Sequence, residues 1–184
     1  MEPLENQLST RGALSYYLAG LFDGEGSFFV NLLKNKNWSA VLRIKISSTD
    51  EQSLIEIKNL LGFGKVYSYN AKNLKENHLQ GYAYYLSNFG DIEKFVDLID
   101  GKLIIKRKAL QVFKEAMKIV EEKRKRGITK ASFTKEEIEK LVELREKLTR
   151  RHSKFFRNKE WFAKEISREG FSGLNEKRYD KKHN

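Results

Sequence analysis

The spacing of apolar residues changes along the chain and predicts the order of its structural elements. Apolar positions at helical spacing alternate with short aromatic and β-branched runs that are typical of strands. The predicted helices span 14–23, 51–61 and 91–99, and the predicted strands span 27–34, 39–47, 65–69 and 82–86. This order predicts an α+β fold in which helices pack on one face of a four-stranded antiparallel sheet.

The second half of the chain is predicted to be helical and more basic. Helices are expected at 103–125, 134–149 and 153–166, and the polar tail 167–184 is expected to be poorly ordered. No composition shift or linker suggests a second domain. We therefore expect one domain over 1–184, with its core at about 14–120, C-terminal helices at 121–166 and a basic tail at 167–184.

Alternation along the strands predicts which side chains leave the core. Phe28, Val30 and Leu32 are expected to point inward, as are Leu42, Ile44 and Ile46. The outward positions are Phe29, Asn31, Arg43, Lys45, Ser47, Lys65, Tyr67, Tyr69 and, more weakly, Tyr85. Asparagine, arginine, lysine and aromatic side chains suit readout of base edges in the DNA major groove. The alternative is an ordinary solvated sheet face.

Composition narrows the classes of partner. The 184 residues carry a formal charge of +11, which favours a polyanion such as nucleic acid. No long apolar run supports a membrane protein, and the start of the chain lacks a signal-peptide core. We expect an intracellular, non-secreted protein, in the cytoplasm or nucleoid of a prokaryote or in an organelle. The absence of cysteine removes disulfides and thiol catalysis.

Residues 18–27 hold the most informative pattern, Leu-Ala-Gly-Leu-Phe-Asp-Gly-Glu-Gly-Ser. A small-residue helical turn leads into two carboxylates, Asp23 and Glu25, and then into a predicted strand. A carboxylate at such a helix end, beside free backbone carbonyls, is a natural ligand for a hard divalent cation. The plainer alternative is an amphipathic helix closed by a glycine cap.

This stretch closely resembles the LAGLIDADG motif of the homing endonucleases. Leu18 to Leu21 match the first four letters, Asp23 the first acid and Glu25 the last acid. By order of elements the resemblance extends over about 14–120. It implies Mg²⁺-dependent (or Mn²⁺-dependent) hydrolysis of double-stranded DNA, with Glu25 as the catalytic metal ligand and the Gly24 backbone carbonyl as its companion. Asp23 is either a second ligand or a helix cap or intersubunit contact.

The chain carries a single copy of the motif, although cutting a duplex needs an acid for each strand. The resemblance therefore implies a homodimer on a long near-palindromic site, with Ala19, Gly20, Asp23 and Gly24 at the interface. The alternative for the small residues is packing against the chain's own sheet.

The resemblance implies further assignments for Lys106, Ser48 and a possible RNA partner. Lys106 is expected to take part in catalysis, unless it only begins a basic helix. Ser48, which stands where the family commonly has glutamine, is expected to take part in catalysis as well. Intron RNA is a possible partner, since a splicing cofactor (maturase) or a non-catalytic DNA-binding protein on the same fold is the alternative function. The basic residues Lys123, Arg124, Lys125, Arg126, Arg150 and Arg151 are expected either to contact phosphates or to be merely solvated.

Overall fold

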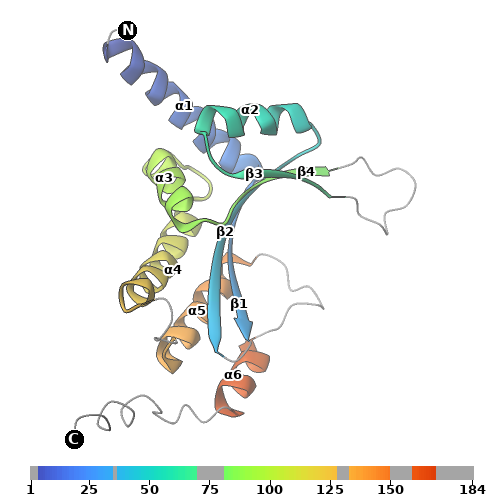
Figure 1. Cartoon of the computed structure of the whole chain (residues 1–184), viewed down its shortest axis with the longest axis vertical. Helices are drawn as coiled ribbons and strands as arrows, with labels where there is room; N and C mark the ends of the chain where they lie inside the picture. Colours follow the sequence, from blue (N-terminus) through green and yellow to red (C-terminus); the bar gives the residue numbers. More distant parts are fainter. Residues whose placement is uncertain (1–3, 35–36, 70–80, 128–132, 150–158, 169–184) are drawn as a thin grey trace, which may run out of the picture.

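The computed structural model describes residues 4–34, 37–69, 81–127, 133–149 and 159–168. Its elements are α1 (Leu4–Glu25), β1 (Gly26–Lys34), β2 (Trp38–Ser48), α2 (Glu51–Leu61), β3 (Lys65–Tyr69), β4 (Gly81–Leu86), α3 (Phe89–Ile99), α4 (Arg107–Lys125), α5 (Lys135–Leu148) and α6 (Lys159–Arg168). Figure 1 shows α3 and α4 together on one side of the sheet, with α1 and α2 near one end of it. The predicted α+β fold and its element order are confirmed.

The four strands form one antiparallel sheet in the order β1-β2-β4-β3. In the register, Phe28 pairs with Ile44 and Phe29 with Arg43. Burial alternates along β1 and the second half of β2, so Phe28, Val30 and Ile44 face the core while Arg43 is exposed. The predicted assignment of inward and outward positions on these strands is therefore confirmed.

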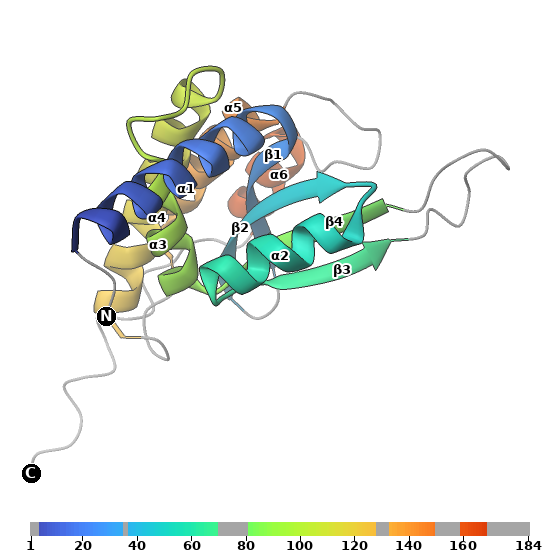
Figure 2. The same ribbon diagram turned by 90° about the horizontal axis from the view of Figure 1, so that it is seen from above.

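Aromatic side chains join the sheet to the helices. The Phe22 ring of α1 lies 4.6 Å from that of Phe28 and 5.7 Å from that of Phe95 on α3. Phe28 also stacks on Phe113 of α4 at a centroid distance of 4.7 Å. Ring pairs at these distances add to the stabilisation that comes from burial. The end of α1 is therefore anchored to the sheet and to two helices. Figure 2 shows α1 passing close to both β1 and α3.

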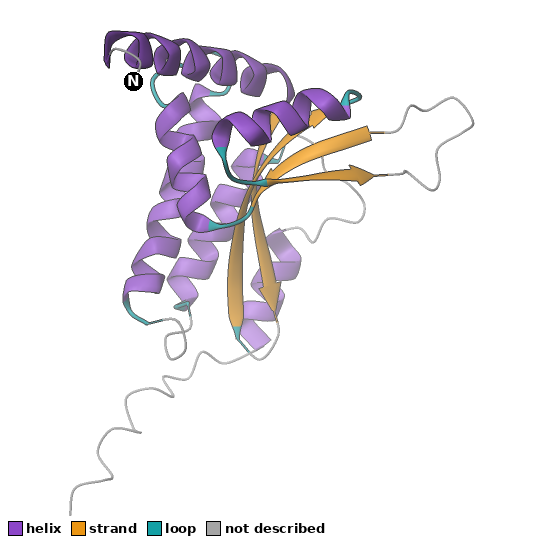
Figure 3. Cartoon of the chain, turned by 45° about the horizontal axis from the view of Figure 1, so that its top comes forward, coloured by secondary structure: helices purple, strands orange, loops and turns teal. Residues whose placement is uncertain are grey.

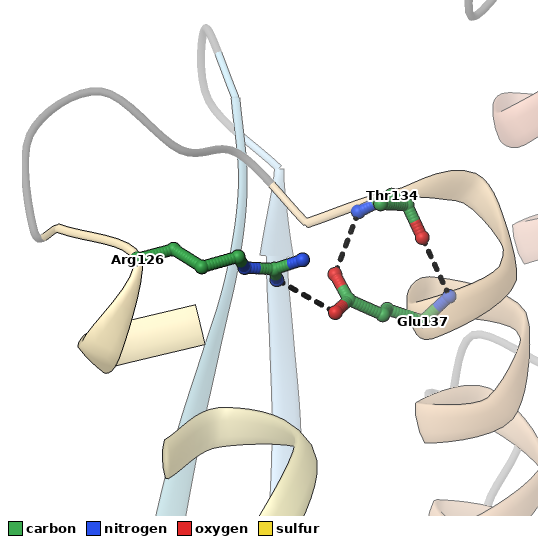
Figure 4. Close-up of polar contacts among 3 residues, drawn as sticks. All are labelled: Arg126, Thr134 and Glu137. Atoms are coloured by element: carbon green, nitrogen blue, oxygen red, sulfur yellow. Dashed lines mark hydrogen bonds and ion pairs between the residues drawn. The ribbon is translucent and has the colours of Figure 1, made fainter. Parts of the chain in front are cut away.

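The C-terminal helices cover β1 and extend the core. The α4–α5 junction is held by a capping box, in which Thr134 N–H donates to Glu137 Oε2 at 2.8 Å and Glu137 N–H donates to Thr134 Oγ1 at 3.2 Å. Arg126, the C-cap residue of α4, donates to the other Glu137 oxygen at 2.6 Å (Figure 4). Further along, Phe162 of α6 packs on Trp38 at 5.8 Å. These contacts fix α5 and α6 relative to the sheet.

Two helix boundaries differ from the sequence-based prediction. Helix α1 begins at Leu4 rather than near Leu14, because residues 4–13 carry too few periodic apolar side chains to mark a helix. Helix α4 begins at Arg107 rather than at Leu103. Residues 104–106 instead present their backbone N–H groups to Asp23.

No helix in the described part of the chain is long and apolar enough to cross a membrane. The predicted helix start at Ser153, the tail 167–184 beyond residue 168, and the loop 70–80 lie outside the described residues.

Candidate active site and sheet surface

The end of α1 places Glu25 at an exposed corner between helix and sheet. Leu18, Ala19 and Phe22 are buried, with at most 1% of each side chain exposed, so they fix the rotation of the helix. A Cβ atom on Gly26 would lie 2.2 Å from the Phe22 ring, so only glycine allows the chain to pass this ring into β1. Glu25, the last residue of α1, is left exposed beside the final carbonyls of the helix.

The carboxylate of Asp23 caps the segment that leads into α4. It accepts hydrogen bonds from the backbone N–H groups of Ile104 at 2.7 Å, Ile105 at 3.1 Å and Lys106 at 2.8 Å. Partial burial raises the pKa of the Asp23 carboxyl, but these three hydrogen bonds and the Lys106 charge together lower the pKa below its usual value. Both carboxylate oxygens are thus engaged within the chain, which favours the capping role over metal binding.

The Lys106 side chain contacts the same end of α1, where it binds backbone carbonyls. Its ammonium group donates to the backbone carbonyls of Phe22 at 2.9 Å and Gly24 at 3.2 Å, and also to that of Asp23. The last carbonyls of a helix have no partner within the helix and form its negative end. The ammonium group therefore satisfies three acceptors that the helix itself leaves open.

A cleft of about 710 Å³ opens beside these residues. Glu25 and Lys106 border it, and so do Phe29, Asn31 and Ser47 of the sheet. The structure thus brings together the predicted acid, the predicted lysine and part of the predicted DNA-reading surface.

Arg145 is a cleft residue that the sequence analysis missed. It belongs to α5, is 8% exposed, and its guanidinium carbon lies 5.1 Å from the centre of the Phe162 ring. Burial lowers the pKa of the guanidinium group. The available signal was the helical spacing, since Arg145 continues the apolar stripe of Ile138, Leu141 and Val142.

Ser48 is not among the residues that border the cleft, and its catalytic role stays a prediction. Side chains alternate along β2, so Ser48 points away from the side that Ser47 occupies. The Ser48 hydroxyl accepts a hydrogen bond from the Asp50 N–H at 2.9 Å and thereby shapes the turn into α2. Ser47, predicted only as a DNA contact, borders the cleft instead.

The small residues of α1 divide between two faces. Ala19 is 1% exposed and packs within the chain's own core, so its predicted place at a dimer interface is corrected. Gly20 and Gly24 are exposed, and a Cβ atom added to either would meet nothing within 4 Å. Tyr16 and Tyr17 lie on this same exposed side, at 68% and 56% exposure. The open face of α1 therefore combines small and aromatic residues.

The outer face of β3 and β4 carries a cluster of tyrosines around one lysine. Lys45 Nζ lies 4.7 Å from the centre of the Tyr69 ring and 5.8 Å from that of Tyr85. Tyr67 meets Tyr85 edge to face at 5.8 Å. A Cβ atom on Gly81 would lie 2.4 Å from Tyr69, so the Tyr69 ring lies directly over this glycine. Figure 3 shows β3 and β4 extending away from α3 and α4.

The basic residues at the end of α4 all have partners inside the chain. Lys125 pairs with Glu121 at 2.7 Å and Arg126 with Glu137 at 2.6 Å. The remaining two lie over aromatic rings: Lys123 is 5.7 Å from the centre of the Phe133 ring and Arg124 is 4.8 Å from that of Phe89. These contacts favour structural roles for the four residues, whereas Arg150 and Arg151 lie outside the described residues.

The donors at the cleft fit a divalent cation only in part within one chain. Among the described residues, no group of three or more histidine, cysteine or acidic side chains could hold a metal. Glu25 supplies one carboxylate, and the carbonyls at the end of α1 already accept a cationic group, the Lys106 ammonium. Oxygen donors of this kind suit Mg²⁺, which usually keeps several waters and is bound by one or two carboxylates together with phosphate oxygens of a substrate.

Comparisons with known proteins identify the family and the fold. Residues 18–120, more than half of the chain, match the family model described as LAGLIDADG endonuclease. A search of curated protein sequences found no significant match. Among solved structures, the homing endonuclease I-CvuI in complex with a DNA target superimposes with a TM-score of 0.65 at 15% identity, covering 87% of this chain and 96% of that one. The archaeal intron-encoded homing endonuclease I-Vdi141I, complexed with DNA, superimposes with a TM-score of 0.64 at 20% identity, covering 84% of this chain and 94% of that one. The meganuclease I-AabMI, bound to uncleaved DNA, superimposes with a TM-score of 0.59 at 24% identity, covering 78% of this chain but 47% of the other.

Proposed function

Because the chain belongs to the LAGLIDADG endonuclease family, we propose that it is a homodimeric, divalent-metal-dependent endonuclease that cuts both strands of a long near-palindromic DNA site. One observation carries the proposal: Glu25 lies exposed at the end of α1, in a cleft shared with Lys106 and bordered by outward-facing residues of the sheet. Glu25 and Lys106 are therefore placed to act on the sugar-phosphate backbone of DNA bound to the sheet.

In the proposed site, Glu25 and the Gly24 carbonyl hold Mg²⁺ or Mn²⁺, with further ligands from water, DNA phosphates and the second subunit. The bound cation would activate water and stabilise the charge that develops on the phosphate. Asp23 binds the backbone N–H groups of residues 104–106 and so fixes the position of the Lys106 backbone. Lys106 provides a positive charge beside Glu25, where the phosphate would lie.

The sheet surface supports the choice of DNA as substrate. Arg43 and Lys45 on β2 lie on the same face as Tyr67 and Tyr69 of β3 and Tyr85 of β4. The ring contacts of Lys45 limit the directions in which its ammonium can point. Such a surface can contact bases, whereas the chain's charge of +11 supplies general attraction to phosphates.

The open face of α1 supports the homodimer. Gly20 and Gly24 let a second helix backbone approach closely, and Tyr16 and Tyr17 offer apolar area around them. Ile104 and Ile105, at 80% and 68% exposure, add a second apolar element. Because Asp23 binds their N–H groups, this element lies at the same end of α1. A twofold axis at this end would bring two copies of Glu25 together.

The dimer is tested by changing Gly20 to leucine. A Cβ atom at this position has open space around it, so the monomer should keep its circular dichroism spectrum, whereas the leucine side chain should block the close approach of a second helix. Sedimentation equilibrium should show wild type at twice the 21.6 kDa chain mass and Gly20→Leu near the chain mass. The change Gly20→Ala should weaken association less. If Gly20→Leu remains as dimeric as wild type, this face is not the interface.

Cleavage is tested with wild type and Glu25→Gln on a plasmid library of random near-palindromes, in Mg²⁺ and then in Ca²⁺. Wild type should linearise a subset of plasmids only with Mg²⁺, and Glu25→Gln should bind that subset without cutting. The matched control is Glu93→Gln, which makes the same change at an exposed position of α3 and should cut normally. If wild type cuts no plasmid and binds structured RNA instead, the endonuclease proposal fails.

A further inference from the structure

The three carbonyls at the end of α1 are already occupied by a positive charge that belongs to the chain. We propose that the Lys106 ammonium group takes the place of a divalent cation on these carbonyls in the free protein, so that Lys106 competes with metal for Gly24. This inference rests on the proposed function, in which Glu25 and the Gly24 carbonyl bind the metal.

The contacts of Lys106 match those of a cation bound to a helix C-terminus. An ammonium group has three N–H donors, and here they meet the carbonyl oxygens of Phe22, Asp23 and Gly24. The negative end of the helix dipole adds attraction for any positive charge at this position. A divalent cation would be attracted to the same oxygens for the same reason.

The position of Lys106 is set by the fold rather than by its side chain alone. The Lys106 N–H donates to Asp23 Oδ1 at 2.8 Å, and the two preceding N–H groups donate to Asp23 Oδ2. Asp23 and the carbonyls belong to the same turn of α1, so the helix end binds both the backbone and the side chain of Lys106. This double attachment holds the ammonium group over the carbonyls.

The two cations compete because both are attracted to the Gly24 oxygen. Lys106 Nζ lies 3.2 Å from the Gly24 oxygen. A Mg²⁺–oxygen bond is about 2.1 Å long, so a directly bound ion would lie within about 5 Å of the ammonium nitrogen. Repulsion between charges of +2 and +1 at that distance, even with the dielectric constant of water, corresponds to roughly a tenfold weaker binding of the metal. The free protein should therefore bind divalent cations weakly at this site.

The experiment measures Mn²⁺ binding to the DNA-free protein by electron paramagnetic resonance, which detects the loss of the free-ion signal. Lys106→Met keeps most of the side-chain length but removes the charge and the donors. Its Mn²⁺ affinity should rise about tenfold over wild type. The matched control is Lys108→Met, which removes one positive charge from an exposed position two residues further along and should change the affinity less than about twofold. Lys106→Gln serves as the second variant if Lys106→Met fails to keep the wild-type circular dichroism spectrum.

The outcomes separate this inference from the proposed function. If the gain appears in Lys106→Met and disappears when Glu25→Gln is added, Lys106 competes for the site that Glu25 forms. If Glu25→Gln weakens Mn²⁺ binding but Lys106→Met binds no more tightly than Lys108→Met, the metal site stands and the inference about Lys106 is overturned. If Glu25→Gln binds Mn²⁺ as wild type does, the metal-binding role of Glu25 in the proposed function fails as well.

Discussion

Replacing Asp23 with asparagine should lower the free energy of unfolding by about 2 kcal/mol at neutral pH. The carboxylate accepts three backbone N–H groups, at 2.7, 3.1 and 2.8 Å. A single side-chain cap contributes about 1 kcal/mol, and hydrogen bonds to a charged group contribute more. Asparagine keeps one oxygen but turns an NH₂ group toward at least one of the N–H donors. The loss of one hydrogen bond and of the negative charge together accounts for the expected decrease of about 2 kcal/mol in the free energy of unfolding.

The pH dependence provides a second, independent expectation. The pKa of the folded Asp23 carboxyl lies below its ordinary value of 3.8, because its three hydrogen bonds and the nearby Lys106 charge outweigh its partial burial. A carboxyl with a lowered folded pKa stabilises the protein above the ordinary pKa and loses this contribution as the pH falls through the folded pKa. The difference between wild type and Asp23→Asn should therefore be full at pH 7 and shrink below about pH 4.

Urea unfolding followed by circular dichroism, at equal protein concentration and several pH values, measures both expectations. The melting temperature should fall by about 4–8 °C at pH 7 for a chain of this size. The control Asp97→Asn makes the same change at an exposed position of α3 and should shift stability by less than about 0.5 kcal/mol. The capping role of Asp23 is refuted if Asp23→Asn matches the control at pH 7, or if its deficit persists undiminished in acid.

Three glycine substitutions give two further predictions. Gly64→Ala should cost about 3 kcal/mol in urea unfolding, because the glycine has φ of 86° and a new Cβ would lie 2.4 Å from the buried Tyr84 ring. Gly101→Ala, which also has positive φ but open space around it, should cost only about 1 kcal/mol, and equal costs would contradict the role given to the ring. Gly81→Ala should displace the exposed Tyr69 ring and weaken binding to a selected DNA duplex about tenfold, as measured by fluorescence anisotropy. Unchanged affinity would remove Tyr69 from the proposed DNA surface.

Local patterns in the sequence were sufficient to predict the elements and the faces of the strands. The apolar alternation of β1 and β2 predicted that Phe28 and Ile44 face inward and Arg43 outward, because side chains alternate along any strand. The ten residues 18–27 predicted the helix end, the turn into the sheet and the exposed Glu25, because glycines and buried apolar residues within one turn determine them locally.

The tertiary structure alone decided how distant residues share one site. Asp23 and Lys106 are far apart in the chain, and no spacing rule shows that the first binds the backbone of the second while the second covers the carbonyls of the first. Arg145 reaches the cleft only because α5 packs beside β1. Ala19 and Gly20 are both small, yet one is buried and the other open, because the rotation of α1 is set by the rings of Phe28 and Phe95 packed on Phe22. Contacts between segments depend on packing in three dimensions, and local sequence patterns carry no information about that packing.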